Sequence, residues 1–345
     1  MKASKFHFHI IIHPLLAAVT ILFLTMGLTA CKDEVEEKQK RDVSFGTGVT
    51  AADELSTLSR AIARAIKNSA PHFKMTSHEN PGGTAEVLRD LTRYDICGSS
   101  LDEAAQAYCG FFQWKGQPHP QLRLLSIMGI LPISFIVAAD SDIKSIHDLK
   151  GRPLGSGNIK SIASFKVMKL LKALNITPQW NRDPWTTQID LYQKKALVGF
   201  LHHGAVDPLL LQCSQHRSFN ILELPESELS KVNQFYRGTG LTYPPCSVRE
   251  GTYPDQSESI KTFGLMLGYF TRHDVPAEVG YWMVKAAWAE VWNLSASYEP
   301  LKLDVIRFPK LTLKYGPFPL HSGAVRFYKE IRLEVPDRLL PPEMR

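Results

Sequence analysis

The sequence is poor in the features that mark several large classes of protein. It contains no low-complexity tract, and only 21% of its 345 residues are charged, which argues against a disordered chain. Its formal net charge of +6 is mild and evenly spread, so no nucleic-acid partner is expected. Apolar residues make up 44% of the chain, which is enough to bury a large core, and the length favours two lobes.

Motifs for catalysis and metal binding are also lacking. The sequence contains no G-x-S-x-G, H-E-x-x-H or C-x-x-C pattern. The neighbouring His202 and His203 fall on an expected strand, where adjacent side chains point to opposite faces and are unsuited to sharing one metal ion. We therefore expect no cofactor, no metal site and no enzymatic activity. A periplasmic enzyme stays open as an alternative, because a catalytic triad is assembled in space and leaves no fixed spacing in the sequence.

The amino terminus has the pattern of a bacterial lipoprotein signal. Two lysines precede an apolar run from Pro14 to Met26, which is too short for a permanent membrane span, and Leu-Thr-Ala then leads to Cys31. This pattern predicts a signal peptide over 1–30, a lipid on Cys31, and a periplasmic protein anchored to a bacterial membrane. The charged residues 31–42 are expected to form a tether. An ordinary signal peptide with an incidental cysteine is the alternative.

The rest of the chain has no segment of eighteen apolar residues, so no membrane-spanning helix is expected there. It does contain four further cysteines, and an extracytoplasmic location permits disulfides. We expect Cys97 to pair with Cys109 and Cys213 with Cys246, whereas four buried free thiols are an equally open alternative. The spacings match no zinc pattern.

Strands followed by glycine-containing turns and helices recur along the chain and predict an α/β fold. The first such turn covers residues 46–50, and a later one contains Gly83 and Thr84. These turns can hold an anion on free backbone N–H groups at a helix start, and Thr84 is expected to cap its helix. Ile127–Ala139 and Phe263–Thr271 are apolar strands that we expect to carry the chain between the lobes. Phe263–Thr271 is expected to be buried on both faces.

Two motifs resemble those of the solute-binding proteins of TAXI-type TRAP transporters. The first begins at Gly251, reads G-T-Y-P-x-Q, and is followed by a strand and R-x-D-x-P; the second is PLHSGAVRFYKE, from Pro319 to Glu330. The resemblance implies a two-lobed periplasmic-binding-protein fold of the Venus-flytrap, type II-like kind, with a central ligand cleft. We expect lobe I to cover 43–131 plus 250–345, and lobe II to cover 132–249.

The same resemblance implies which residues hold the ligand. They are Thr47, Gly48, Val49, Thr50, Gly83, Thr84, Ser100, Asn158, Lys160, Ser161 and Ala205. Ser100 stands where the family usually has glutamine, and Ser164 stands where it has an arginine that would pair with a carboxylate. Lys160 is the cation of its loop and would hold a negative charge from a neighbouring position; a solvated loop lysine is the alternative.

The function implied by the resemblance is transport rather than catalysis. An extracytoplasmic solute-binding protein of this family captures a small organic solute by lobe closure and delivers it to TRAP membrane subunits. Family members with known ligands mostly bind small carboxylates, glutamate and 2-oxo acids among them, so a carboxylate is expected here. We expect a monomeric protein whose partners are the solute, the transporter and the membrane that holds its anchor. A sensor lipoprotein and a neutral or more apolar ligand stay open as alternatives.

Overall fold

The computed structural model describes residues 41–46, 54–79, 83–157, 161–203, 208–254, 256–297 and 302–345. The chain divides into two compact units, Met1–Arg41 and Asp42–Arg345. The described helices and strands lie in the second unit, apart from Arg41 at the start of the first strand. The predicted signal peptide, Cys31 and the tether up to residue 40 lie outside the described residues.

Helices and strands alternate along most of the chain, which confirms the predicted α/β class. The strands are β1 (Arg41–Gly46), β2 (Phe73–His78), β3 (Ile96–Ser100), β4 (Leu122–Ala138), β5 (Pro153–Gly155), β6 (Gln179–Asn181), β7 (Gly199–His203), β8 (Phe219–Leu222), β9 (Pro245–Val248) and β10 (Ile260–Arg272). The helices are α2 (Glu54–Ser69), α3 (Gly83–Arg89), α4 (Leu101–Cys109), α5 (Ile162–Ala173), α6 (Trp185–Gln193), α7 (Pro208–His216), α8 (Glu226–Phe235), α9 (Ala277–Ala289), α10 (Val291–Ser297), α11 (Lys302–Ile306), α12 (Phe308–Tyr315) and α13 (Ser322–Glu330).

The described strands form one mixed sheet in the order β2-β1-β3-β10-β4-β7-β5-β6, with β8 beside β4 and β9 beside β10. β4 and β10 are its longest strands, and nearly every residue in them is buried, as a strand covered on both faces requires. The prediction of a strand buried on both faces at Phe263–Thr271 is therefore confirmed, and the strand predicted at Ile127–Ala139 is present up to Ala138. β10 runs antiparallel to both of its neighbours in the order, β3 and β4.

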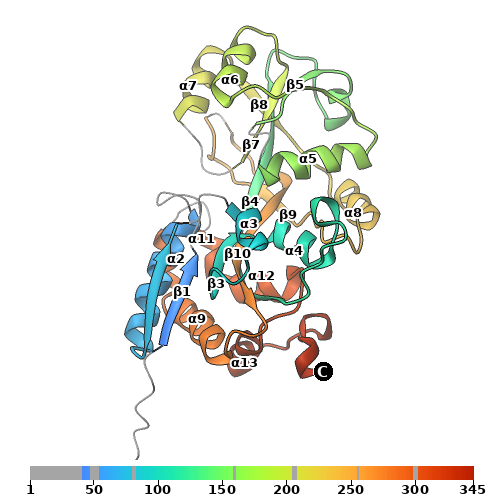
Figure 1. Ribbon diagram of the computed structural model, residues 1–345. Helices are drawn as coiled ribbons and strands as arrows, with labels where there is room; N and C mark the ends of the chain where they lie inside the picture. Colours follow the sequence, from blue (N-terminus) through green and yellow to red (C-terminus); the bar gives the residue numbers. More distant parts are fainter. Residues whose placement is uncertain are drawn as a thin grey trace, which may run out of the picture. The chain divides into compact units, whose positions relative to one another are not determined.

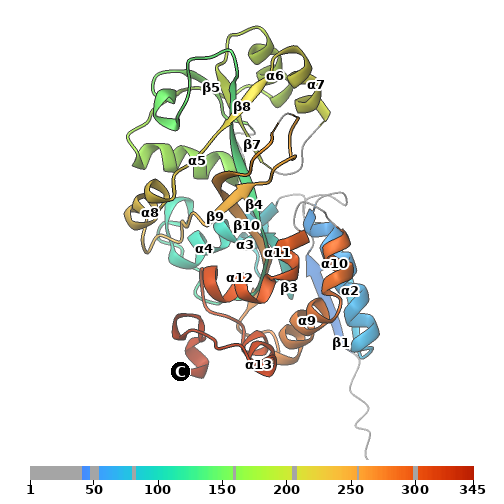
Figure 2. The same ribbon diagram turned by 180° about the vertical axis from the view of Figure 1, so that it is seen from behind.

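β4 changes its strand partner halfway along its length. Its first part, up to Pro132, pairs with β10, whereas Ile133 and the residues after it pair with β7 and β8. Within residues 42–345, Figures 1 and 2 show two lobes that share this strand: α5, α6 and α7 gather around one end of β4, and α2, α9, α12 and α13 gather around the other. The exact lobe boundaries given above stay a prediction.

The carboxy-terminal helices complete the edge of β4 that β7 leaves open. The N–H of Ile127 donates to Thr312 Oγ1 on α12, and the N–H of Ile130 donates to Asp304 Oδ2 on α11, both at 2.8 Å. A strand edge without such partners would leave buried polar groups unsatisfied. The segment after β10 thus belongs to the core that surrounds the first part of β4.

Candidate functional site

The carboxyl ends of parallel strands mark where a ligand would bind in each lobe. β1 is parallel to β3, and β5 is parallel to β7. In open α/β sheets, ligands bind in the crevice beyond such strand ends, next to the helices that follow. The loops after β1, β3, β5 and β7 are therefore the candidate site, and most of the predicted ligand-binding residues lie in or beside them.

The structure describes only part of the predicted set. Gly83, Thr84, Ser100 and Ser161 are described, whereas the remaining residues lie outside the described ranges: Thr47, Gly48, Val49, Thr50, Asn158, Lys160 and Ala205. The proposed cationic role of Lys160 thus stays a prediction. The described residues do include the framework that holds these loops.

Thr84 does not cap its helix as predicted, whereas its predicted contact with a ligand stays a prediction. It lies inside α3, after Gly83, so it is not the cap of that helix. Its side chain is buried, and its hydroxyl forms a hydrogen bond with the hydroxyl of Ser99 on β3. Thr84 therefore ties α3 to the neighbouring strand, because a buried hydroxyl needs a partner that water cannot supply.

Ser100 and Ser161 both occupy helix N-cap positions, but only one of them caps. Ser161 Oγ accepts the N–H of Ser164 at 3.2 Å and so caps α5. Ser100 precedes α4, and its hydroxyl is enclosed without a hydrogen-bond partner among the described residues. A hydroxyl in that position has a donor and an acceptor available for a molecule beyond the end of β3.

Ser164, at the position where the resemblance implies an arginine, holds a loop. Ser164 is buried, and its hydroxyl donates to the carbonyl of Ser156 at 2.6 Å. Gln188 fixes the next residue from the other side, since Gly157 N–H donates to its Oε1 at 3.0 Å and its Nε2 donates to Gly157 O at 2.9 Å. Gly157 itself has a φ of 64°, which favours glycine. This loop therefore rests on neutral hydrogen bonds.

The G-T-Y-P-x-Q motif is a turn that holds itself together and reaches the second lobe. Gln256 Oε1 accepts the Tyr253 N–H at 3.2 Å, and Gln256 Nε2 donates to Glu258 O at 3.0 Å. The Tyr253 hydroxyl lies 3.0 Å from His202 Nδ1 on β7 and 3.5 Å from Ser134 Oγ on β4. Sequence reasoning did not assign this contact, although both residues stood in motifs that it singled out.

A buried ion pair joins α4, α5 and β10, and nothing in the sequence marked it as a pair. Lys166 Nζ lies 2.6 Å from Asp102 Oδ1, with both side chains fully buried. β3 ends opposite Leu267, and beyond that point Asp102 accepts the Met266 N–H at 2.8 Å while Lys166 donates to Gly264 O at 3.0 Å. The pair therefore satisfies backbone groups of β10 where β3 no longer reaches.

Desolvation dominates the titration of this pair. Burial raises the pKa of Asp102 and lowers the pKa of Lys166, and the attraction between the two groups opposes both shifts only in part. The Lys166 ammonium also lies 5.2 Å from the centre of the Tyr243 ring, which offers it a further favourable contact.

The predicted disulfides are not formed in the structure, where none of the four described cysteines is bonded to another. Cys97 is buried on β3 and Cys109 is the last residue of α4, while Cys213 lies on α7 in a separate small core and Cys246 lies on β9. Burial raises the pKa of the Cys97 and Cys246 thiols, which keeps them protonated. Cys97 and Cys213 are buried, whereas Cys109 and Cys246 are partly exposed, so the alternative of four buried thiols fits only the first two.

The described residues contain neither a metal-binding cluster nor a helix suited to crossing a membrane. No group of three or more His, Cys, Asp or Glu side chains in the described ranges is placed to hold a metal ion. None of the helices in that same part of the chain combines the length and the apolar character that a membrane crossing requires.

Comparison with known proteins gives similar structures of low identity. The periplasmic aliphatic sulphonate binding protein SsuA from Escherichia coli is 14% identical with a TM-score of 0.45, over 88% of this chain and 97% of that one. A TctC solute binding protein from Polaromonas is 13% identical with a TM-score of 0.46, over 77% and 88%. The L-cystine solute receptor of Neisseria gonorrhoeae is 15% identical with a TM-score of 0.40, over 76% and 95%.

Likenesses at this level identify no ligand for the chain. The family comparison is more informative, because a single family model matches residues 45–331, which include almost all of the described helices and strands. On that match, the chain belongs to the NMT1-like family.

Proposed function

We propose that this protein is an extracytoplasmic solute-binding protein, which takes a small organic solute between its lobes and delivers it to a TRAP-type transporter. The arrangement of strands supports this most directly. In each lobe the candidate loops follow the carboxyl ends of parallel strands, and β4 runs through both lobes. A ligand that contacts loops from both lobes would favour the closed state, because only that state makes both sets of contacts.

The chemistry of the described loops favours recognition by hydrogen bonds. Ser100 offers a hydroxyl without a described partner, while the side chain of Ser164 is engaged with the Ser156 carbonyl. A carboxylate, glutamate-like or a 2-oxo acid, would then be held by backbone N–H groups at helix starts and by Lys160. In this proposal Lys160 replaces the family's arginine as a point charge without the bidentate geometry.

Calorimetry on the purified protein tests the ligand class, after a thermal-shift screen of small carboxylates and their amides has supplied a binder. Replacing Lys160 by alanine should weaken binding of a carboxylate about ten- to a hundredfold, the equivalent of losing one charge-assisted hydrogen bond of about 1.5–3 kcal/mol. Lys150→Ala is the matched control, since Lys150 is an exposed lysine outside the candidate loops. Equal affinities for an acid and its amide, together with an unchanged affinity in Lys160→Ala, would show that the solute is not held as an anion.

Transport itself needs a separate experiment. Vesicles that contain TRAP membrane subunits should accumulate the labelled solute only when the binding protein is added, and the solute should be recovered chemically unchanged. Turnover of the solute by the binding protein alone would instead identify an enzyme.

A further inference from the structure

β8 has one edge that no other described strand covers. It pairs with β4 alone, in the register Val137↔Asn220 and Ala138↔Phe219. Ala139 N–H donates to the carbonyl of Ser218 at 3.0 Å, so Ser218 faces β4. Because facing and outward residues alternate in an antiparallel ladder, the N–H and C=O groups of Phe219 and Ile221 point to the open edge. Among the described residues none forms a backbone hydrogen bond with them there.

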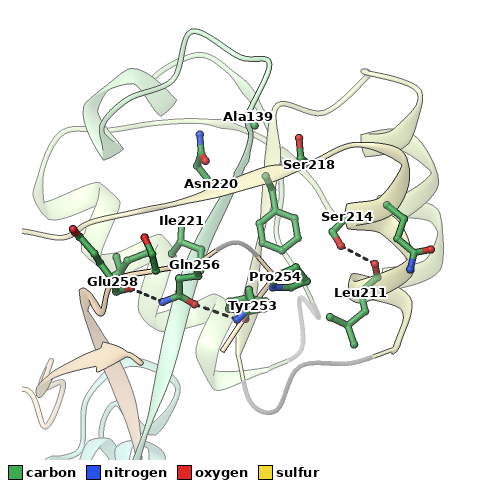
Figure 3. Close-up of a pocket in the computed structure, with 14 residues that line it drawn as sticks. Ala139, Leu211, Ser214, Ser218, Asn220, Ile221, Tyr253, Pro254, Gln256 and Glu258 are labelled. Atoms are coloured by element: carbon green, nitrogen blue, oxygen red, sulfur yellow. Dashed lines mark hydrogen bonds between the residues drawn. The ribbon is translucent and has the colours of Figure 1, made fainter. Parts of the chain in front are cut away.

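A groove of about 880 Å³ runs along this edge (Figure 3). One wall is the outer edge of β8, and the others come from α7 and from the turn that contains Tyr253 and Gln256. At the far end of β8 the chain closes on β10, where Leu224 N–H donates to Lys261 O at 3.0 Å. The groove is thus the gap between β8 and the segment that leads into β10.

Some of the polar side chains around the groove are held by other groups of the protein. Gln256 is held by the turn itself, as the dashed lines of Figure 3 show, and Ser214 Oγ donates to the Leu211 carbonyl at 2.7 Å. Phe219 packs edge-on against Tyr253, with 5.5 Å between the ring centres. The groove also presents the polar side chains of Gln215, Ser218, Asn220 and Ser257, and the outward backbone groups of β8 add donors and acceptors at the regular spacing of a strand.

We propose that this groove binds an extended segment of a partner protein, which adds to the sheet as a strand beside β8. An extended backbone alternates donors and acceptors with the spacing of β8, so it would form hydrogen bonds with the outward N–H and C=O groups of Phe219 and Ile221. Strand addition to other exposed sheet edges works in the same way. β8 has four residues, so about four to six residues of the partner would be in contact.

The charge and the shape of the groove restrict which partner segments can bind. Glu258 is the one described lining residue that is charged at neutral pH, and the described lining includes no lysine, arginine or histidine. A segment with a basic residue at one end and otherwise uncharged, alternately apolar side chains fits this wall; Leu211, which is 39% exposed, adds apolar surface at the rim. A second copy of this chain fits badly, because its own β8 lies in the same recess and does not project.

Binding of defined peptides tests the proposal. The probes are fluorescein-labelled Lys-Thr-Val-Thr-Val-Thr and Thr-Val-Thr-Val-Thr-Lys, capped at both ends, and the readout is fluorescence anisotropy with the full-length protein. At least one of them should bind, and Phe219 and Ile221 should gain protection in amide hydrogen exchange. Failure of both peptides to bind at millimolar protein overturns the proposal, as does protection confined to other residues.

Backbone methylation of the bound peptide separates strand addition from ordinary side-chain contact. Two versions carry N-methyl groups on alternate residues, one on each edge of the strand. The version methylated on the edge that faces β8 should bind at least fivefold more weakly, because it loses two or more hydrogen bonds, while the other should bind as before. Equal weakening of both versions overturns the proposal.

Variants of the protein test where the peptide binds. Glu258→Lys should weaken binding of the basic peptide about threefold or more at low salt, and the effect should vanish at high salt. Ile221→Pro should abolish binding because it removes the outward N–H, whereas Ile221→Val, which keeps that group, should not. Should Ile221→Pro fail to fold, the methylated peptides decide on the unaltered protein. Unchanged binding in Glu258→Lys, or a concentration-dependent dimer that Ile221→Pro abolishes, contradicts the proposed partner.

Discussion

Replacing Lys166 by methionine should be one of the most destabilising single changes in the described part of the chain. The substitution removes the cation that balances the fully buried Asp102 and leaves the Gly264 carbonyl without its donor. Methionine fills a similar volume, so the cost comes from charge and hydrogen bonding rather than from a cavity. Breaking a buried pair in this way typically costs about 3–5 kcal/mol of the free energy of unfolding.

A variant that replaces both Asp102 and Lys166 tests whether the cost of Lys166→Met comes from the charge left behind. Burial disfavours both charges in the native protein, so replacing both partners removes the desolvation penalty together with the attraction. Asp102→Leu combined with Lys166→Met then leaves only the Met266 N–H and the Gly264 carbonyl unpaired, at about 1–3 kcal/mol each. The double variant should therefore be no less stable than Lys166→Met, although it has lost one more native side chain.

Urea unfolding followed by tryptophan fluorescence measures these differences. Lys194→Met is the matched control, because Lys194 forms a surface pair with Asp190 at 2.7 Å and should cost no more than about 1 kcal/mol. In Lys166→Met, the free energy of unfolding should fall as the pH rises above about 4. The reason is that above this pH the Asp102 carboxyl ionises in the unfolded chain, whereas in the native state its raised pKa keeps it protonated. A loss below 1 kcal/mol, or additive losses in the double variant, would refute the reasoning.

Three further predictions concern other parts of the chain. Gly240 has a φ of 76°, and a Cβ there would meet the Ala105 carbonyl, whereas Gly116 has a similar φ of 79° and open space around it. Gly240→Ala should therefore lower the free energy of unfolding by about 2 kcal/mol more than Gly116→Ala does, as measured by urea unfolding. Because burial lowers the pKa of His321, whose Nδ1 accepts the Gly323 N–H, stability should fall below about pH 6.5, and less so in His321→Asn. Cys31→Ser should move the protein from the membrane to the soluble fraction of fractionated cells; a wild-type protein that is already soluble would contradict the anchor.

Long buried strands were the most predictable part of the fold. A strand covered on both faces must be apolar along its whole length, and this gave Phe263–Thr271 within β10. The start of β4 was harder, since the structure begins it at Leu122, before the predicted Ile127. Arg123 interrupts the apolar pattern there, yet it is buried because Glu343 pairs with it at 2.8 Å from far along the chain.

The contacts around the candidate site could not be predicted for the same reason. Thr84 looked like a helix cap in the sequence, and its actual partner, Ser99, is on another element. Asp102 and Lys166 lie in different helices, and no local pattern distinguishes a buried lysine from a solvated one. Sequence motifs located the loops, whereas the side-chain partners depend on which elements the fold brings together.

The central place of β10 also determines the order in which the protein can assemble. During synthesis the amino-terminal part is made first, at about 5–20 residues per second, so β3 waits on the order of ten seconds for β10 to follow it out of the ribosome. In that interval β3 has an unpaired edge, because β10 lies between β3 and β4 in the sheet. The strands from β5 to β8 pair with β4, which is already made, or with one another. The nascent chain should therefore fold from its middle outward, with β1 to β3 the segment that most needs protection from aggregation until the chain is nearly complete.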